Sequence, residues 1–423
     1  MNRSIIPLPA NMIVEDYSTL LTRIARKLVH GQFARISSGE IILRENNTEY
    51  YFGKATDDFP QPVVIDVHHP SLYSDVAFGG SPGSGEAYMK GSWDCSDMTG
   101  LVRIMLRNRD VLDSMDHGIT RLKGPLQKLM HRLNRNTRSG SKKNISAHYD
   151  IGNDLFKLFL DQTMMYSSAY YERPEMTLEQ ASVAKLDLVC KKLDLKPGDH
   201  LLEIGTGWGG LALHAAHNYG CRVTTTTISE QQYCYALDKV RNEGLDDRIE
   251  VINKDYRDLD GQYDKLVSIE MIEAIGHQYM NNYFSTCSSL LKPEGMMLIQ
   301  AITIRDQLYD NALKDVDFIK KYIFPGGFLP SVSVMTSAIS RQTDMKIFHL
   351  QDIGPHYART LRDWKSRFLA NLDDVRRLGY SEQFIRLWDY YFCYCEGGFL
   401  EHDIGTVQML LTKPGNRRSP VIL

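Results

Sequence analysis

A glycine-rich stretch near the middle of the chain, residues 200–210, most constrains what this sequence can fold into. It reads H-L-L-E-I-G-T-G-W-G-G, a short apolar run followed by an acid and then by four glycines within six residues. This pattern is typical of a buried strand that turns sharply into a helix. Glycine suits the turn because the backbone must bend tightly and approach a ligand with no Cβ in the way. The helix expected at residues 210–219 would point its N-terminal amides at that ligand, so the stretch predicts a nucleotide-like cofactor.

The spacing Gly205-x-Gly207-x-x-Gly210 also matches the fingerprint of NAD and FAD proteins, so a second observation must identify the cofactor. Glu203 precedes the first glycine by two residues, where its carboxylate can reach the cationic amino acid end of S-adenosylmethionine (SAM). The NAD pattern also needs an acid about twenty residues further on, to bind the ribose. Residues 225–229 there read T-T-T-I-S. Both details favour SAM.

Length, charge and cysteine usage narrow the class of protein. A chain of 423 residues with 43% hydrophobic residues fits a globular protein of about two or three domains. A net charge of −3 argues against a dedicated nucleic-acid binder, so no nucleic-acid partner is expected. The seven cysteines include no C-x-x-C pair, and we expect no metal site. We find neither a signal-peptide pattern nor eighteen consecutive apolar residues, which predicts a cytoplasmic protein with reduced thiols.

The first 113 residues predict a small α+β domain without a catalytic constellation. Residues 17–29 have the spacing of an amphipathic helix, which either packs on its own domain, the reading we favour, or lies on a lipid surface. Three short runs at residues 40–44, 49–52 and 63–67 predict an antiparallel sheet. A turn-rich segment is expected at 81–93, and a single helix follows at 96–113.

Residues 114–145 predict a basic linker. Between residues 116 and 143, eight Lys and Arg residues face a single acid, Asp116. A solvated connection is one reading of this run. The other is attachment to anionic phospholipid headgroups, to which each Lys or Arg near the surface contributes about 1 kcal/mol. Under the second reading the protein would associate peripherally with the inner face of the membrane.

Residues 146–423 predict the catalytic domain. From residue 196 strands alternate with helices, which indicates an α/β fold with a seven-stranded, Rossmann-like sheet. The strands are expected at residues 200–204, 221–226, 249–253, 265–269, 296–302, 347–351 and 406–412. An insertion at 304–345 is rich in aromatic residues, which either line an apolar substrate channel together with Tyr166, Tyr170 and Tyr171 or belong to the core.

Several motifs together resemble the cyclopropane-fatty-acyl-phospholipid synthase family, which includes the mycolic acid cyclopropane synthases. The matching stretches are residues 148–154 (H-Y-D-I-G-N-D), 165–169 (M-Y-S-S-A), 202–210, 254–258 (K-D-Y-R-D), 271–274 (M-I-E-A), 322–327 (Y-I-F-P-G-G) and 395–399 (C-E-G-G-F). The resemblance implies a class I SAM-dependent methyltransferase fold and an activity on double bonds of acyl chains in membrane phospholipid. Residues 1–113 look like the smaller lipid-binding domain of longer members. A homodimer is left open.

The resemblance, together with the glycine loop, also implies site residues. The expected cofactor-binding residues are Tyr166, Ser167, Glu203, Gly205, Gly207, Gly209, Thr227, Gln232, Asp255 and Tyr256. The expected catalytic residues are Glu273, Tyr357, Ser168 and Gln300, which with the backbone around Glu270 would surround a bicarbonate ion, and Cys395 close by. Many relatives have Cys at 168 and His at 300; both replacements keep hydrogen-bonding capacity.

Residue chemistry agrees with that assignment. Methyl transfer to an alkene leaves a carbocation, so the site needs a base and dry, electron-rich walls, which tyrosine faces provide. Glu273, hydrogen-bonded to bicarbonate, would position that base. We expect a cyclopropane product; methyl transfer without ring closure, giving a methyl-branched or methylene chain, is the first alternative. Methylation of a soluble amine and a lipid-binding protein without catalysis are the others.

Overall fold

The computed structural model describes residues 20–117 and 152–419, and these form two compact units. The first unit contains the described N-terminal residues together with 316–323 and 372–403. The second contains the remaining described residues from 152 onward. The boundaries expected from the sequence follow the linear chain, whereas two later segments group with the N-terminal residues. The predicted linker lies almost entirely outside the described residues.

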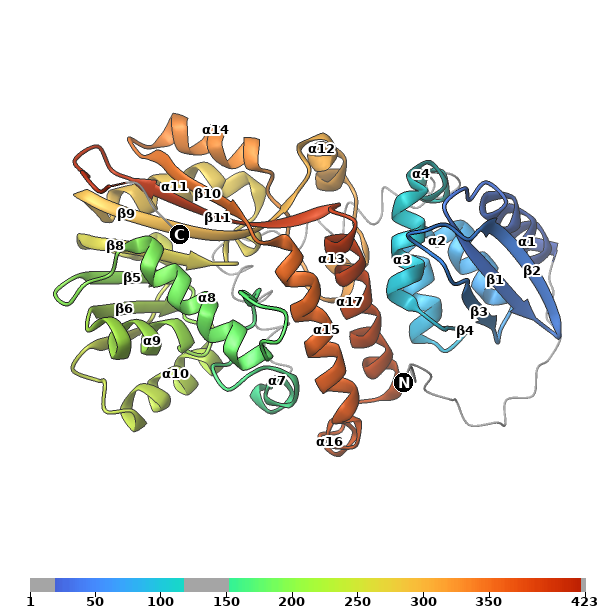
Figure 1. The fold of residues 1–423 in the computed structure, drawn as a ribbon, viewed down its shortest axis with the longest axis horizontal. Coiled ribbons are helices and arrows are strands. Elements are labelled where there is room, and N and C mark those ends of the chain that lie inside the picture. Colours follow the sequence, from blue (N-terminus) through green and yellow to red (C-terminus); the bar gives the residue numbers. More distant parts are fainter. Residues whose placement is uncertain (1–19, 118–151, 420–423) are drawn as a thin grey trace. The chain divides into compact units, whose positions relative to one another are not determined.

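The larger unit is built on a seven-stranded sheet with the order β10-β11-β9-β8-β5-β6-β7 (Figure 1). All neighbouring strands are parallel except those that pair with β11, which is antiparallel to both β10 and β9. The strands are β5 (His200–Ile204), β6 (Arg222–Thr227), β7 (Ile249–Asn253), β8 (Tyr263–Ile269), β9 (Leu291–Ile304), β10 (Lys346–Asp352) and β11 (Ile404–Thr412). The α/β fold with seven strands is confirmed. The strand order reverses between β5 and β8, and parallel sheets bind ligands at the carboxyl ends of strands at such a point.

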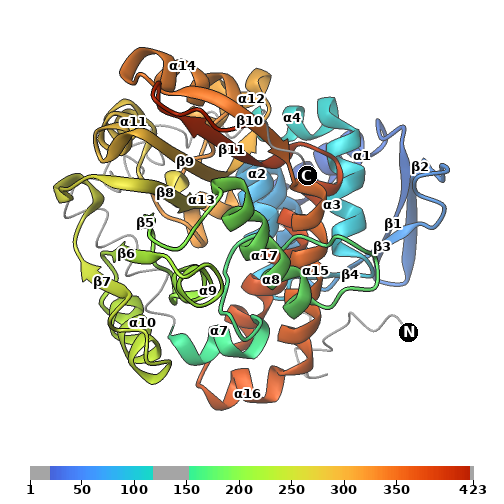
Figure 2. The same ribbon diagram turned by 60° about the vertical axis from the view of Figure 1, so that its left-hand side comes forward.

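Helices cover both faces of this sheet, because successive strand residues point to opposite sides. On one face Leu201 and Val267 pack with residues of α8 (Leu178–Leu193), α9 (Gly210–Tyr219) and α10 (Glu230–Asn242). On the other face Leu202 and Leu266 pack with α11 (Met280–Ser289) and α14 (Val332–Gln342). The helices α11 and α14 lie side by side (Figure 2). The central strands β5, β8 and β9 are therefore largely buried on both faces, whereas the edge strand β10 is mostly exposed.

The remaining helical elements of the larger unit are short, apart from α15. They are α7 (Asn153–Phe159), η2 (Tyr256–Asp258), η3 (Ile272–Ala274), η4 (His277–Tyr279), α12 (Asp306–Lys314) and α15 (Gly354–Ala370). Within the described residues, no helix of either unit is long and apolar enough to span a bilayer.

The smaller unit has a four-stranded mixed sheet with the order β2-β1-β3-β4. Its strands are β1 (Gly39–Glu45), β2 (Thr48–Lys54), β3 (Val63–Val67) and β4 (Trp93–Cys95). The expectation of an antiparallel sheet was wrong for one pair, since β3 runs parallel to β1. The chain leaves β2 through residues 55–62 and returns on the other side of β1, so β3 pairs with β1 instead of extending the hairpin.

The expectation of a turn-rich segment at 81–93 was wrong over most of its length. Helix α2 (Ser71–Met89) includes this region, with a kink at Gly80, where φ is 59°. The glycines that suggested turns serve close packing. A Cβ on Gly83 would lie 2.0 Å from the carbonyl oxygen of Asp75, and one on Gly85 would lie 2.4 Å from the ring of Phe318. Glycine is required here for close approach inside a helix.

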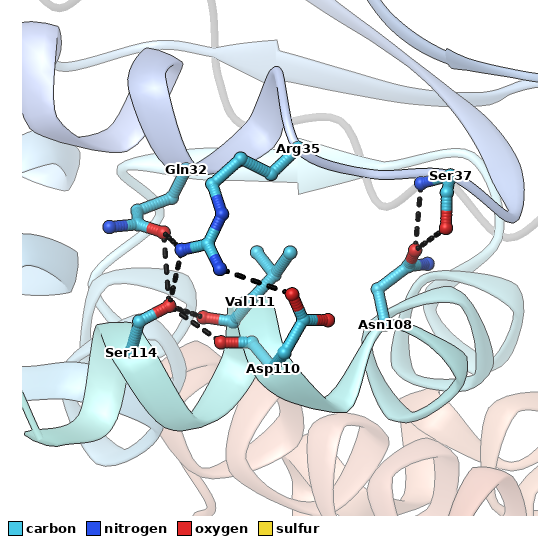
Figure 3. Close-up of polar contacts among 7 residues, drawn as sticks. All are labelled: Gln32, Arg35, Ser37, Asn108, Asp110, Val111 and Ser114. Atoms are coloured by element: carbon cyan, nitrogen blue, oxygen red, sulfur yellow. Dashed lines mark hydrogen bonds and ion pairs between the residues drawn. The ribbon is translucent and has the colours of Figure 1, made fainter.

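The single helix expected at 96–113 is two helices, α3 (Met98–Arg107) and α4 (Arg109–His117). Asp97 caps the first, because its side chain accepts a hydrogen bond from the backbone amide of Gly100. The break falls at Asn108, whose side-chain oxygen accepts hydrogen bonds from the backbone amide and the hydroxyl of Ser37 (Figure 3). A long-range contact that the sequence does not show therefore interrupts the helix.

The end of α1 (Leu20–Phe33) is joined to α4 by a second set of polar contacts (Figure 3). Arg35 forms an ion pair with Asp110 and donates a hydrogen bond to Ser114. The single hydroxyl hydrogen of Ser114 lies within hydrogen-bonding reach of Gln32 on α1 and of backbone carbonyls of its own helix, which are alternative acceptors. These contacts fix the orientation of α1 in the unit.

The segments 316–323 and 372–403 contribute α13 (Phe318–Tyr322), α16 (Leu372–Arg377) and α17 (Glu382–Leu400) to the smaller unit. Helix α17 packs on α2 and α3. Arg386 is buried and pairs with Asp94, and Thr99 donates a hydrogen bond to Glu396. Buried polar contacts of this kind explain why these late segments group with the N-terminal residues.

Candidate active site

The glycine-rich stretch folds as a strand, a tight loop and a helix. Strand β5 ends at Ile204 and α9 begins at Gly210. Between them Gly205, Gly207 and Gly209 have φ values of 103°, 53° and 84°, which side chains with a Cβ rarely adopt. The loop conformation thus depends on glycine at all three positions.

This loop forms one wall of a pocket at the carboxyl ends of β5, β6 and β8. The structure brings nine of the ten expected cofactor-binding residues to the pocket lining: Tyr166, Ser167, Glu203, Gly205, Gly207, Thr227, Gln232, Asp255 and Tyr256. Gly209 does not line it and instead caps α9. Within the pocket the Thr227 hydroxyl donates to the Gln232 side-chain oxygen at 2.9 Å.

The acids of the pocket suit a cationic ligand. Glu203 is buried at the end of β5 and accepts a hydrogen bond of 2.6 Å from the Thr225 hydroxyl. Burial raises the pKa of Glu203 to about 8, so the pocket by itself holds this carboxyl mostly neutral at pH 7. A ligand ammonium or sulfonium would favour its charged form. Asp255 is different, because Arg257 already binds both of its oxygens.

Aromatic rings line the same region around Tyr166. The ring centroid of Tyr166 lies 5.1 Å from that of Phe156 and 5.2 Å from that of Trp364, and Phe324 of the insertion lies 6.5 Å away. Trp364 also contacts Tyr357, at 6.1 Å. Of the other tyrosines considered for a channel, Tyr171 instead donates its hydroxyl to Asp363. Tyr166 presents the aromatic surface of the pocket, and Phe156 and Trp364 are fully buried behind it.

The centre of the site is a carboxylate whose side chain received no role in the sequence interpretation. Glu270 is partly buried, follows β8 and lines the pocket. Its Oε1 accepts hydrogen bonds from the backbone amide of Ser168 (3.0 Å) and from Nε2 of Gln300 (2.7 Å), and its Oε2 accepts one from the Tyr357 hydroxyl (2.8 Å). Three expected catalytic residues therefore meet at Glu270. Its φ of 51°, uncommon for glutamate, was not foreseeable from the sequence alone.

Glu273, the expected positioning acid, is held by the backbone. Its Oε1 accepts from the amide of Ile302 at 2.5 Å, and its buried Oε2 has no hydrogen-bond partner among the described residues. Burial, together with the nearby charge of Glu270, raises the pKa of Glu273 to about 8. Its carbonyl oxygen accepts from the amide of Phe328, which joins the insertion to the site. Glu273 does not line the pocket.

Two buried lysines of α8 complete the polar surroundings. Lys185 donates to the hydroxyl of Ser167 at 2.9 Å and interacts electrostatically with Glu270 and Glu203. Burial lowers the pKa of Lys185, and also that of Lys192, to about 8. The two lysines are seven residues apart on the apolar side of a helix, a spacing that the sequence does show.

Lys192 begins a chain of hydrogen bonds that ends at Glu270. Its ammonium donates to Oε1 of Gln408 (2.8 Å), Nε2 of Gln408 donates to Oε1 of Gln300 (2.9 Å), and Nε2 of Gln300 donates to Glu270. Because an ammonium can only donate, each amide in the chain has a fixed orientation. Gln300 must therefore present its N–H to the carboxylate.

The last expected catalytic residue, Cys395, lies on α17 in the smaller unit, so its role stays a prediction. Burial raises the pKa of its thiol above the ordinary value, which disfavours a thiolate. Among the described residues, we find no cluster of three His, Cys, Asp or Glu side chains that could hold a metal ion.

With this geometry established, comparison with known proteins is informative. Residues 136–409 match the family described as mycolic acid cyclopropane synthetase. The chain belongs to this family. Cyclopropane-fatty-acyl-phospholipid synthase of Escherichia coli K12 is 38% identical over 354 residues, which cover 83% of this chain and 88% of that enzyme. Tuberculostearic acid methyltransferase UfaA1 of Mycobacterium tuberculosis is 35% identical over 364 residues, 84% of each chain.

The solved structure of a relative agrees with this family assignment. The structure of mycolic acid cyclopropane synthase CmaA1 with SAH and CTAB superimposes with a TM-score of 0.61 and 33% identity, covering 64% of this chain and 98% of that one. This member of the cyclopropane synthetase family is thus a SAM-dependent methyltransferase, and the predicted fold, enzyme class and methyl donor are confirmed. The roles of individual residues stay predictions.

Proposed function

We propose that this enzyme transfers the methyl group of SAM to the double bond of unsaturated acyl chains in membrane phospholipids and closes a cyclopropane ring. The observation that carries the proposal is the meeting of the cofactor pocket, an aromatic surface and a partly buried carboxylate at one place. SAM, when bound, supplies an electrophilic methyl group. The pocket residues would hold it, with Glu203 facing its cationic end.

The chain's own residues suit a cationic reaction on a hydrocarbon. The ring of Tyr166, which lines the pocket and is backed by the buried Trp364, would offer electron density to a carbocation and help to exclude water, which would otherwise quench it. Glu270 provides a negative charge at the edge of the same pocket. Methylation of a soluble amine depends less on an aromatic wall and a nearby negative charge, because the amine nitrogen is itself the nucleophile.

Helix α1 supports access to lipid at a membrane surface. It buries Ala25, Val29 and Phe33 in the smaller unit, whereas Leu20, Leu21, Ile24 and Leu28 are 41–74% exposed. Arg23 and Lys27 are exposed beside this apolar strip. Apolar side chains flanked by basic ones are typical of helices that lie on anionic lipid surfaces. One face of this helix packs on its own unit, and we propose that the exposed face contacts lipid.

Methyl transfer without ring closure is the second candidate, and one comparison favours it. UfaA1, which shares 35% identity over 84% of this chain, is named as a methyltransferase and not as a cyclopropane synthase. The choice depends on which proton leaves the carbocation. Loss from the new methyl group closes a ring, and loss from a neighbouring chain carbon leaves a methyl-branched alkene.

Vesicle assays test the proposal. The purified protein is incubated with SAM and vesicles of either unsaturated or saturated phospholipid, and in parallel with a panel of soluble amines. We expect formation of SAH, and acyl chains heavier by one CH₂, with unsaturated vesicles alone. SAH formation with amines but not with unsaturated lipid would contradict the proposal.

A further inference from the structure

The hydrogen-bond donors expected to bind bicarbonate are already engaged. The Ser168 hydroxyl donates to the carbonyl oxygen of Ala169, and Nε2 of Gln300 donates to Glu270. The backbone amide of Ser168 and the Tyr357 hydroxyl each have a single hydrogen, and both bind Glu270. Bicarbonate would also bring a further negative charge beside Glu270, and the two anions would compete for the ammonium of Lys185. The residues present do not fit this ion.

We propose that the carboxylate of Glu270 takes the place of bicarbonate and is itself the proton acceptor of the reaction. The proposal rests on the function proposed above, because it concerns the proton that leaves after methyl transfer. It replaces a diffusible base by a side chain whose position is set by the fold.

The hydrogen-bond chain from Lys192 fixes the acceptor state of Glu270. Lys192 only donates, so Gln408 and then Gln300 are oriented to donate toward Glu270. The Ser168 amide adds a second donor to Oε1. A proton on Oε1 would face two N–H groups, so these donors favour the carboxylate form of Glu270. Its Oε1 is used as an acceptor, and its Oε2 can accept a further hydrogen.

The surroundings of Glu270 and Glu273 give these two acids different protonation states. Desolvation raises the pKa of both acids, but Glu270 receives three hydrogen bonds and lies near the ammonium of Lys185, which oppose that rise, whereas Glu273 receives one hydrogen bond from Ile302. Where two carboxyl groups share a buried site, the proton resides on the less stabilised one. Glu273 is therefore the neutral member of the pair and Glu270 the ionised member.

Position and backbone geometry agree with a catalytic role. Glu270 lines the pocket together with Tyr166 and the glycine loop, whereas Glu273 does not. Its left-handed backbone conformation, with φ at 51°, is unfavourable for glutamate and is maintained by a hydrogen bond from its amide to the Gln300 carbonyl. Such backbone strain is concentrated at functional sites.

The proposed step balances without an oxidant or reductant. As the methyl group moves, its bond to sulfur breaks and the π electrons of the alkene form a new C–C bond, which leaves a cation on the acyl chain. Glu270 then accepts a proton from one of two carbons. If the proton leaves the new methyl group, which is one carbon removed from the cation, the electron pair of that C–H bond forms the second C–C bond of the ring. If it leaves a chain carbon next to the cation, the pair forms a new double bond. The carboxylic acid returns the proton to solvent through the pocket.

Bicarbonate depletion and an isosteric variant test the proposal. We expect the wild-type enzyme to turn over unsaturated vesicles equally in degassed and in bicarbonate-supplemented buffer. Glu270→Gln should lose about 10²- to 10⁴-fold in kcat, the usual contribution of a general base, with its SAM affinity retained in calorimetry. Glu294→Gln, which removes an exposed carboxylate on β9, is the matched control.

Chemical rescue provides the second readout. Glu270→Ala leaves the Ser168 amide, the Gln300 amide and the Tyr357 hydroxyl without their acceptor, so added bicarbonate or formate should restore part of the turnover. The same anions should not rescue Glu273→Ala. Wild-type activity that falls on depletion and recovers with bicarbonate overturns the proposal, and so does a Glu270→Gln enzyme with wild-type kcat. A wild-type enzyme that modifies no lipid would instead contradict the proposed function.

Discussion

At the residue scale, buried charges define the site, and the sequence reveals only some of them. Glu203 could be assigned because its spacing from the glycines is local. Glu270 could not, because its role depends on donors from three separate segments that meet only when β8 pairs with β9. Lys185 lies on the apolar side of α8, where a sequence pattern cannot tell a buried ammonium from a solvated one.

Replacing Gly207 by valine should abolish SAM binding in a folded protein. The new side chain would point into open space within the pocket, where the cofactor belongs, and the positive φ adds backbone strain of about 1–2 kcal/mol. We expect calorimetry to show a loss of affinity of more than about tenfold. Gly244→Val is the control, because its φ of 64° imposes similar strain outside the pocket. Equal SAM affinity of the two variants would refute the loop assignment.

Glu203 and Glu273 should each make a contribution to the free energy of unfolding without SAM that falls as pH rises from about 5 to 8. Glu203 and Glu273 have a pKa of about 8 in the fold and an ordinary value of 4.5, so between these values the folded state binds more protons than the unfolded state. Each such group contributes a slope of about 1.4 kcal/mol per pH unit. Glu273→Gln should make the pH dependence shallower by about one such slope in urea titrations. Parallel curves for the two proteins would show that Glu273 is charged in the fold.

At the element scale, strands of the larger sheet were most predictable where they contain short apolar runs near turn residues, as in β5, β8 and β9. The smaller unit was less predictable. Glycines in 81–93 read as turns, although Gly83 and Gly85 lie in α2 and allow close packing. The parallel pairing of β3 with β1 and the break at Asn108 both depend on contacts distant in sequence.

Helix α1 should contribute to membrane binding through its exposed apolar side chains. Leu21→Glu combined with Ile24→Glu would place two charges where the lipid surface is expected, and each buried leucine or isoleucine is worth about 1.5–3 kcal/mol. We expect co-sedimentation with anionic vesicles to drop at least about tenfold, with SAM affinity intact. Leu378→Glu, at a leucine 45% exposed in the same unit, should have no effect. Unchanged sedimentation of the double variant would exclude α1 from the lipid surface.

At the scale of the whole molecule, the chain has a larger unit with the methyltransferase fold and a smaller unit. The smaller unit contains the N-terminal residues and two segments from later in the sequence. Residues 372–403 join the N-terminal residues through buried pairs such as Arg386 with Asp94. Dividing the sequence into consecutive domains cannot show that residues 372–403 group with the N-terminal residues. The matched relatives cover most of this chain, so the reaction proposed for the larger unit can be tested on the intact protein.

The most direct test of the central claim follows the fate of the transferred methyl group. The full-length protein is incubated with SAM carrying a trideuterated methyl group and with unsaturated phospholipid vesicles, and the acyl chains are analysed by mass spectrometry before and after catalytic hydrogenation. We predict chains that gain one carbon with two deuterium atoms and do not take up hydrogen, because a methyl proton has left and a ring has closed. Chains that keep all three deuterium atoms and take up hydrogen would contradict ring closure, and unlabelled chains would contradict methyl transfer to the lipid.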